Sequence, residues 1–110
     1  MKHSSAVVLL AAIGALAQTS LAVAEPHYGK VVSKIEVAIS GCYFFQLSGV
    51  DEADPVVPNS PWFAILTTQA NAKEMYAVML TVRTTGATLE RVVTNGQTVC
   101  GHAQVSTIDM

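Results

Sequence analysis

A cysteine and a histidine stand two positions apart near the end of the chain, at Cys100 and His102. Residues i and i+2 of a strand project from the same face, so the pair has the spacing of a thiol nucleophile and its base. A zinc site needs three or four ligands, and the remaining candidates, Cys42 and His27, lack CxxC or HxxxH spacing. The third interpretation is a disulfide between Cys42 and Cys100, and the cellular compartment decides among the three.

The first 24 residues have the three parts of a secretory signal peptide. Lys2 provides the positive start, residues 6–17 form an uncharged apolar run, and "LAVA" ends in a small-x-small cleavage site at Ala24. The run is too short for a spanning helix, which needs about 20 apolar residues. We therefore expect cleavage after Ala24, no membrane insertion afterwards, and one exported domain over residues 25–110 that is periplasmic or secreted.

Export favours the disulfide, because oxidising compartments keep cysteines paired. The sequence has two cysteines, so one intramolecular connectivity exists, Cys42–Cys100. Closing a loop of this length stabilises a small domain by about 4 kcal/mol in the chain-entropy model. The prediction leaves no catalytic residue, no metal-binding set and no cofactor, and it leaves His102 without a role.

The charged residues argue against a nucleic acid as partner, and several acidic residues lie together in residues 48–61. Six Lys and Arg residues, Lys2 among them, stand against eight Asp and Glu residues, and no basic stripe suits a nucleic acid. Residues 48–61 contain three prolines and the acids Asp51, Glu52 and Asp54. The glycine and glutamate of a calcium-binding EF-hand loop are missing there. We expect a solvated acidic loop.

Strand patterns surround this loop. Residues 30–40 alternate, with Ser33 and Ile35 on one face and Val32 and Lys34 on the other. Asn95-Gly96 is a strong hairpin-turn signal. We predict strands over residues 30–40, 42–47, 62–68, 87–93 and 103–110.

One helix is expected over residues 70–86. Asn71 has the position of an N-cap, with Glu74 three residues later, and Gly86 suits the left-handed residue after the last turn. Tyr76 and Leu80 form an apolar pair one turn apart, beside the core-facing stripe, and we predict that they contact another subunit. The stripe itself consists of Met75, Val78, Met79 and Val82.

The order of these elements predicts a mainly β protein with one helix. Five strands with a helix between the third and fourth match the OB-fold, a five-stranded Greek-key barrel. The alternative is an α+β sheet with the helix on one face. The aromatic residues Tyr43, Phe44, Phe45 and Trp62 cannot all face the core, because neighbouring strand residues alternate. The outward set serves either an interface or a ligand platform.

The layout resembles the small B subunits of AB5 toxins, of the subtilase-cytotoxin and typhoid-toxin type. The likeness consists of "CYFFQL", then "PWFAILTT", the helix "AKEMYAVMLTVRTTG" and the late cysteine in "TVCGH". It implies an OB-fold protein that forms a homopentamer with helices lining a central pore. It also implies binding to cell-surface glycans and to a toxin A subunit.

Three hypotheses of function follow. The first is a non-enzymatic exported module that binds glycans as a homo-oligomer, with ligand residues unassigned. The second is a structural or accessory envelope protein that contacts another protein through the loop 48–61. The third is a small thiol hydrolase, which requires a reduced Cys100. We expect a protein without enzymatic activity.

Overall fold

Five strands and one helix make up residues 24–110, the part of the chain that the computed structural model describes. The predicted signal peptide, residues 1–24, lies outside the described part of the chain except for its last residue, Ala24. No helix within residues 24–110 has the length and apolar character needed to cross a membrane. The elements are β1 (Glu25–Val37), β2 (Cys42–Leu47), β3 (Phe63–Leu66), α2 (Ala72–Thr85), β4 (Thr88–Val99) and β5 (His102–Asp109).

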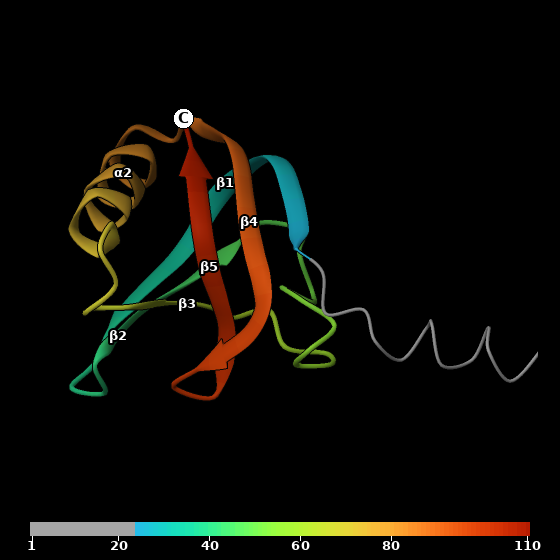
Figure 1. Ribbon diagram of the computed structural model, residues 1–110. Helices are drawn as coiled ribbons and strands as arrows, with labels where there is room; N and C mark the ends of the chain where they lie inside the picture. The colour runs from blue at the N-terminus through green and yellow to red at the C-terminus, as the bar shows by residue number, and fades with distance from the viewer. Residues whose placement is uncertain (1–23) are drawn as a thin grey trace, which may run out of the picture.

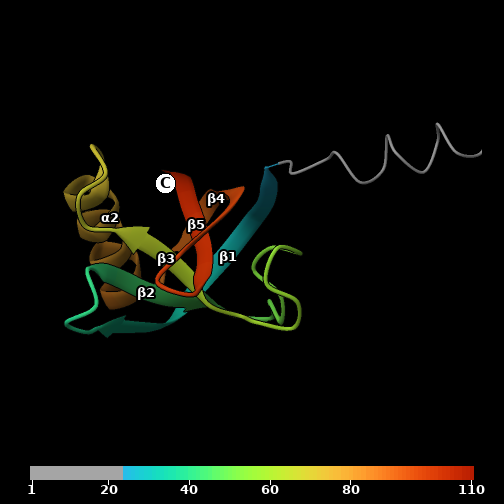
Figure 2. The same cartoon turned by 60° about the horizontal axis from the view of Figure 1, so that its bottom comes forward.

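The strands close into a barrel in the order β1-β2-β3-β5-β4 (Figures 1 and 2). All neighbours are antiparallel except β3 and β5, which run parallel and pair only at Phe63–Ala103 and Ala64–Gln104. This is the expected OB-fold, with the helix between β3 and β4. Closure of the sheet rules out the open α+β alternative.

β1 is longer at its start than the sequence pattern indicates. Residues 25–31 pair with β4, and the strand then crosses to pair with β2 from Val32 onward. Pro26 and Gly29 disfavour a strand locally, which is why the pattern missed this segment. Pairing with β4 outweighs those weak local preferences. At the other end β1 stops at Val37, and residues 38–41 form the turn to β2.

The predicted turn at Asn95-Gly96 is wrong. Both residues lie inside β4, where the backbone hydrogen-bond register shifts between Thr94 and Thr98. The β4–β5 turn is instead Cys100-Gly101, with positive φ angles of 52° and 78°. Two positive φ angles in succession are typical of the type I′ hairpin turn. Gly96, with φ 77°, provides a bulge.

The helix is close to its predicted bounds, and its two ends differ. Gly86 adopts φ 76° and donates its backbone N–H to the Val82 carbonyl, which confirms the predicted left-handed end. Asn71 is the N-cap residue, as predicted, but its side chain makes no capping hydrogen bond, and its Nδ2 instead donates to the Ser106 carbonyl. The helix face that packs on the barrel buries Ala72, Met75, Met79 and Val82.

The loop 48–61 lies across the barrel from α2 (Figures 1 and 2). It was predicted to be solvated, but part of it is buried. Ala53 and Asp54 are buried, whereas Asp51 and Glu52 are exposed. His27 Nε2 donates to the Ala53 carbonyl at 2.7 Å. The loop therefore packs onto the barrel through its middle and exposes its acidic start.

Candidate functional site

A disulfide joins Cys42, the first residue of β2, to Cys100 in the β4–β5 turn. The two Cα atoms are 6.5 Å apart, within the usual range for a disulfide. The predicted pairing is confirmed, and no free cysteine exists among residues 24–110. The hypothesis of a thiol hydrolase thus loses its nucleophile.

The disulfide borders a second apolar cluster on the outer face of β2 and β3. Along β2, Phe45 and Leu47 point into the barrel core, while Phe44 points outward. Phe44, Cys42 and Ala64 are nevertheless buried. The half-buried side chains of Trp62, Leu66 and Val99 pack over them. The outer face of these strands is therefore partly covered by the β4–β5 hairpin.

Three aromatic rings meet at the edge of this cluster. The ring centroid of Phe44 is 6.4 Å from that of Trp62 and 5.3 Å from that of His102, both edge-to-face. The Trp62 and His102 rings are 6.1 Å apart. Lys34 Nζ lies over the Trp62 ring, 5.7 Å from its centroid. We call Lys34, Phe44, Trp62 and His102 the Trp62 platform.

His102 is held in the platform by packing. Its Nδ1 atom is buried and has no hydrogen-bond partner among the described residues. A buried polar atom without a partner raises the free energy of the fold, so the aromatic contacts must hold the ring in place. His102 thus supports Trp62 and Phe44, a role that its position beside a cysteine did not indicate.

A β-bulge places Lys34 beside Trp62. The pairing of β1 with β2 shifts register between Val32, opposite Leu47, and Lys34, opposite Gln46. Strict alternation would put Val32 and Lys34 on one face, as predicted from the sequence. The extra residue, Ser33, lets Val32 enter the core while Lys34 points outward.

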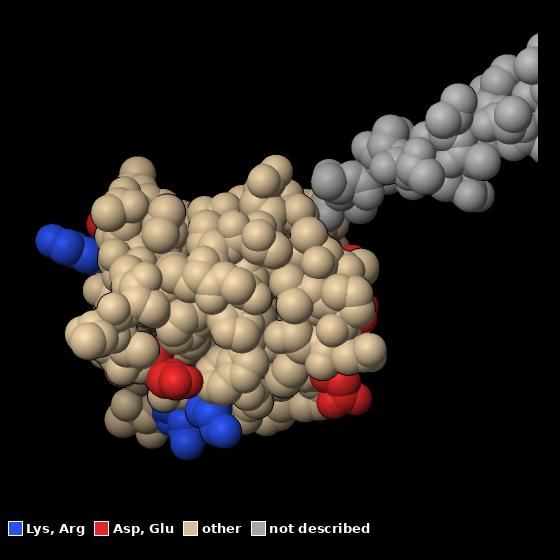
Figure 3. All heavy atoms as spheres, turned by 90° about the horizontal axis from the view of Figure 1, so that it is seen from below, with Lys and Arg blue, Asp and Glu red and all other residues tan. Residues whose placement is uncertain are grey.

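The platform lies where OB-folds bind their ligands. Oligosaccharides and oligonucleotides bind such barrels at the face of strands 2 and 3 and at the loops after strands 1 and 4. In this chain those loops are residues 38–41 and the Cys100-Gly101 turn, which the disulfide links through Cys42. Both turns lie at the bottom of Figure 1, and the view from below in Figure 3 shows a largely uncharged surface with charged side chains toward its edges.

The two residues predicted to contact another subunit lie on α2, and their environments differ. Tyr76 is half-buried, and its ring stacks on that of Tyr43 with centroids 4.1 Å apart. Leu80 has 43% of its surface exposed. Val37 and Ile39, at the end of β1 and in the following turn, are also exposed. The contact of Tyr76 lies largely within the chain, whereas Leu80 is free to meet a partner.

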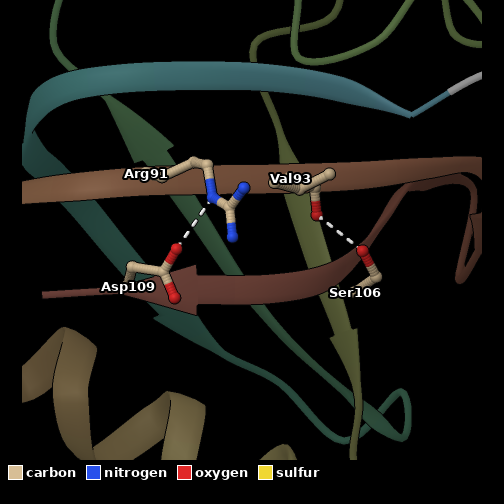
Figure 4. Close-up of polar contacts among 4 residues, drawn as sticks. All are labelled: Arg91, Val93, Ser106 and Asp109. Atoms are coloured by element: carbon tan, nitrogen blue, oxygen red, sulfur yellow. Dashed lines mark hydrogen bonds and ion pairs between the residues drawn. The ribbon is translucent and has the colours of Figure 1, made fainter.

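The other polar contacts stabilise the barrel. Arg91 Nε pairs with Asp109 Oδ2 at 2.7 Å, and the Ser106 hydroxyl donates to the Val93 carbonyl (Figure 4). Both contacts tie β4 to β5. Within residues 24–110, no three His, Cys, Asp or Glu side chains converge as metal ligands.

Comparison with solved structures finds the same fold in a toxin component. The chain is similar to the cholera toxin-like B subunit from Citrobacter freundii, with a TM-score of 0.56 and 8% sequence identity. The match covers 79% of this chain and 85% of the other. No protein-family model matches the chain, and no curated protein matches its sequence. The expected resemblance to AB5 toxin B subunits is thereby confirmed at the level of the fold.

Proposed function

We propose that this protein is a non-enzymatic, exported binding module that holds a glycan on the Trp62 platform. The observation that carries the proposal is the partly buried Trp62 ring, held by Phe44 and His102 at the strand 2 and 3 face of an OB-fold. A rigid indole offers an apolar face to the C–H groups of a sugar ring. Lys34 Nζ, next to the ring, can donate hydrogen bonds to sugar hydroxyls.

Export is part of the same proposal. Cleavage after Ala24 releases a chain that begins at Glu25, the first residue of β1. The disulfide between Cys42 and Cys100 suits an oxidising compartment, periplasmic or extracellular. The expected cleavage site therefore lies directly before the first strand of the barrel.

We further propose that the module works as a homo-oligomer, in keeping with a B-subunit-like fold. Exposed Leu80 supplies the apolar contact on the helix, beside the exposed part of Tyr76. A ring of five copies would repeat the Trp62 platform, and repeated weak sites bind a cell surface far more tightly than one site. The partner that such a ring would carry is a toxin A subunit.

The test uses the exported, oxidised protein on an array of cell-surface oligosaccharides. Trp62 is the sole tryptophan of the sequence, so its fluorescence reports on the platform during a titration with any glycan that is retained. Trp62→Ala should weaken that binding about tenfold or more, the effect of losing about 1.4 kcal/mol. Tyr28→Ala removes an exposed aromatic ring elsewhere and should leave the affinity for the glycan unchanged.

Two results would contradict the glycan proposal. One is an array on which the oxidised wild-type protein retains no glycan. The other is a retained glycan whose affinity is the same for wild type and Trp62→Ala.

The exposed Asp51 and Glu52 favour the second hypothesis, an envelope protein that contacts a protein partner through the loop 48–61. Co-purification of one partner that is lost in Asp51→Asn/Glu52→Gln would support it.

A further inference from the structure

The carboxylate of Asp54 is buried without a cationic partner. It is 3% exposed, Oδ1 accepts the backbone N–H of Val56 at 2.8 Å, and Oδ2 accepts the Thr94 hydroxyl at 2.5 Å. Within residues 24–110, the side chains that form an ion pair are Arg91 and Asp109, and this pair does not include Asp54. A buried carboxylate is costly without a nearby positive charge, even when two donors reach it.

The Thr94 hydroxyl connects this carboxylate to the backbone carbonyl of Glu25. Glu25 pairs with Thr94 across the β1–β4 ladder, and the Thr94 hydroxyl is 3.4 Å from the Glu25 carbonyl oxygen. One hydroxyl thus contacts both the Asp54 carboxylate and the Glu25 carbonyl. The Glu25 nitrogen is only three covalent bonds from that oxygen, so the two atoms lie within about 4 Å of each other.

We propose that signal-peptide cleavage supplies the missing positive charge. Hydrolysis of the Ala24–Glu25 bond transfers the water hydroxyl to the Ala24 carbonyl carbon and a proton to the Glu25 nitrogen. The new carboxyl group loses a proton, and the new amine gains one, because an α-amino group has a pKa of about 7.7–8.0. The Glu25 ammonium group then pairs with Asp54.

This pairing stabilises the loop 48–61 in the mature protein. The loop is attached to β1 at the adjacent residue as well, where His27 Nε2 donates to the Ala53 carbonyl. It also leads directly into Trp62, so the same segment connects the new N-terminus with the Trp62 platform. The precursor, whose Glu25 nitrogen is an uncharged amide, lacks the pair. The inference rests on the proposed cleavage and not on glycan binding.

The experiment is a double-mutant cycle on oxidised protein. Its four chains begin at Glu25 or retain residues 21–24, each with Asp54 or with Asp54→Asn, and intact mass confirms every N-terminus. The extended chain should melt about 4 °C or more below the chain that begins at Glu25. The difference should disappear in the Asp54→Asn pair. Asp51→Asn, which changes an exposed carboxylate of the same loop, should preserve it.

A second measurement covers the case in which Asp54→Asn does not fold. Acetylating the α-amine of the folded wild-type chain that begins at Glu25 should speed proteolysis within residues 48–61. Equal melting temperatures for the two chain lengths, or unchanged proteolysis after acetylation, would overturn the inference. So would an exported protein whose mass shows a start other than Glu25. The glycan array is read separately, so its failure leaves this result intact.

Discussion

The Gln69 side chain connects β3 and β5 where their backbone pairing ends. Beyond Ala64 and Gln104 the backbones of β3 and β5 no longer pair. The Gln69 Oε1 atom accepts the Leu66 backbone N–H at 2.9 Å and the Gln104 side chain at 3.2 Å. Its Nε2 donates to the Val105 carbonyl at 3.1 Å. One side chain thus hydrogen-bonds with both strands at the point where the ladder ends.

We predict that Gln69→Ala lowers the free energy of unfolding by about 1–3 kcal/mol, because it leaves partly buried groups on both strands without partners. Gln69→Glu keeps the acceptor but loses the donor to Val105, so a loss within that range is expected again. Gln97→Ala removes an exposed amide and serves as the control. Urea unfolding of the oxidised proteins measures the change. A stability equal to that of wild type would contradict the bridging role.

Residues whose partners are distant in sequence were the hardest to assign from the chain alone. Gly86 could be predicted, since a helix end is a local pattern. The roles of Gln69, Asn71 and Asp54 could not, because they bond to residues 36, 35 and 40 positions away. Only the register of the folded barrel brings these partners together.

At the level of elements, the β4–β5 hairpin and β2 act as one unit. The disulfide ties the Cys100-Gly101 turn to the start of β2. Val99 of the hairpin also packs against the buried Phe44 and Ala64. The Trp62 platform is therefore supported both by a covalent bond and by apolar contacts.

Removing this link should be measurable in the stability of the whole domain. We predict that the double variant Cys42→Ala/Cys100→Ala loses about 4 kcal/mol, the chain-entropy estimate for a separation of 58 residues. Guanidinium unfolding with and without reductant provides the measurement. Reductant should destabilise wild type and leave the double variant unaffected. Equal stability of the oxidised and reduced wild type would argue against this role.

The order of the elements could be predicted, but the details of the last hairpin could not. Apolar alternation and the amphipathic helix are strong local patterns, so strand and helix identities followed from them. Asn95-Gly96 is an equally strong local turn signal, yet the chain turns at Cys100-Gly101 instead. The disulfide and the packing of Val99 and His102 on Phe44 hold the turn there and leave Gly96 as a bulge.

At the scale of the whole molecule, the proposed assembly depends on Leu80. We predict that the wild-type protein has the mass of several chains in light scattering, and five chains if the ring forms. Leu80→Glu should shift it toward the monomer, because a carboxylate at an apolar contact loses its hydration. Val56→Glu is the control, because Val56 has nearly equal exposure, 41% against 43%, and lies on the loop across the barrel. This variant should keep the mass of wild type.

Two outcomes would count against this assembly. A wild-type protein that is monomeric at all concentrations removes the ring. An oligomer whose mass is the same in Leu80→Glu places the contact elsewhere on the surface. Glycan binding by a monomer would leave the Trp62 platform in place, since all four of its residues come from one chain.

The sequence was informative about the fold and less so about the site. The sequence order of the five strands and the helix led to the OB-fold, which the structure and the B subunit from Citrobacter freundii share. A fold does not specify a ligand, so function has to be argued from particular residues. Trp62 was recognised as a candidate, but Lys34 and His102 join it only through a bulge and a displaced turn.

The disulfide also makes part of this protein a covalent ring. Residues 42–100 form a closed cycle that contains β2, β3, α2 and β4, while β1 and β5 lie outside it. Each outer strand is held between two strands of the cycle, β1 by β2 and β4, and β5 by β3 and β4. Opening either outer strand would therefore leave the connectivity of the cyclic part unchanged. The Cys100-Gly101 turn is thus the closing link of a macrocycle as well as the turn of a hairpin.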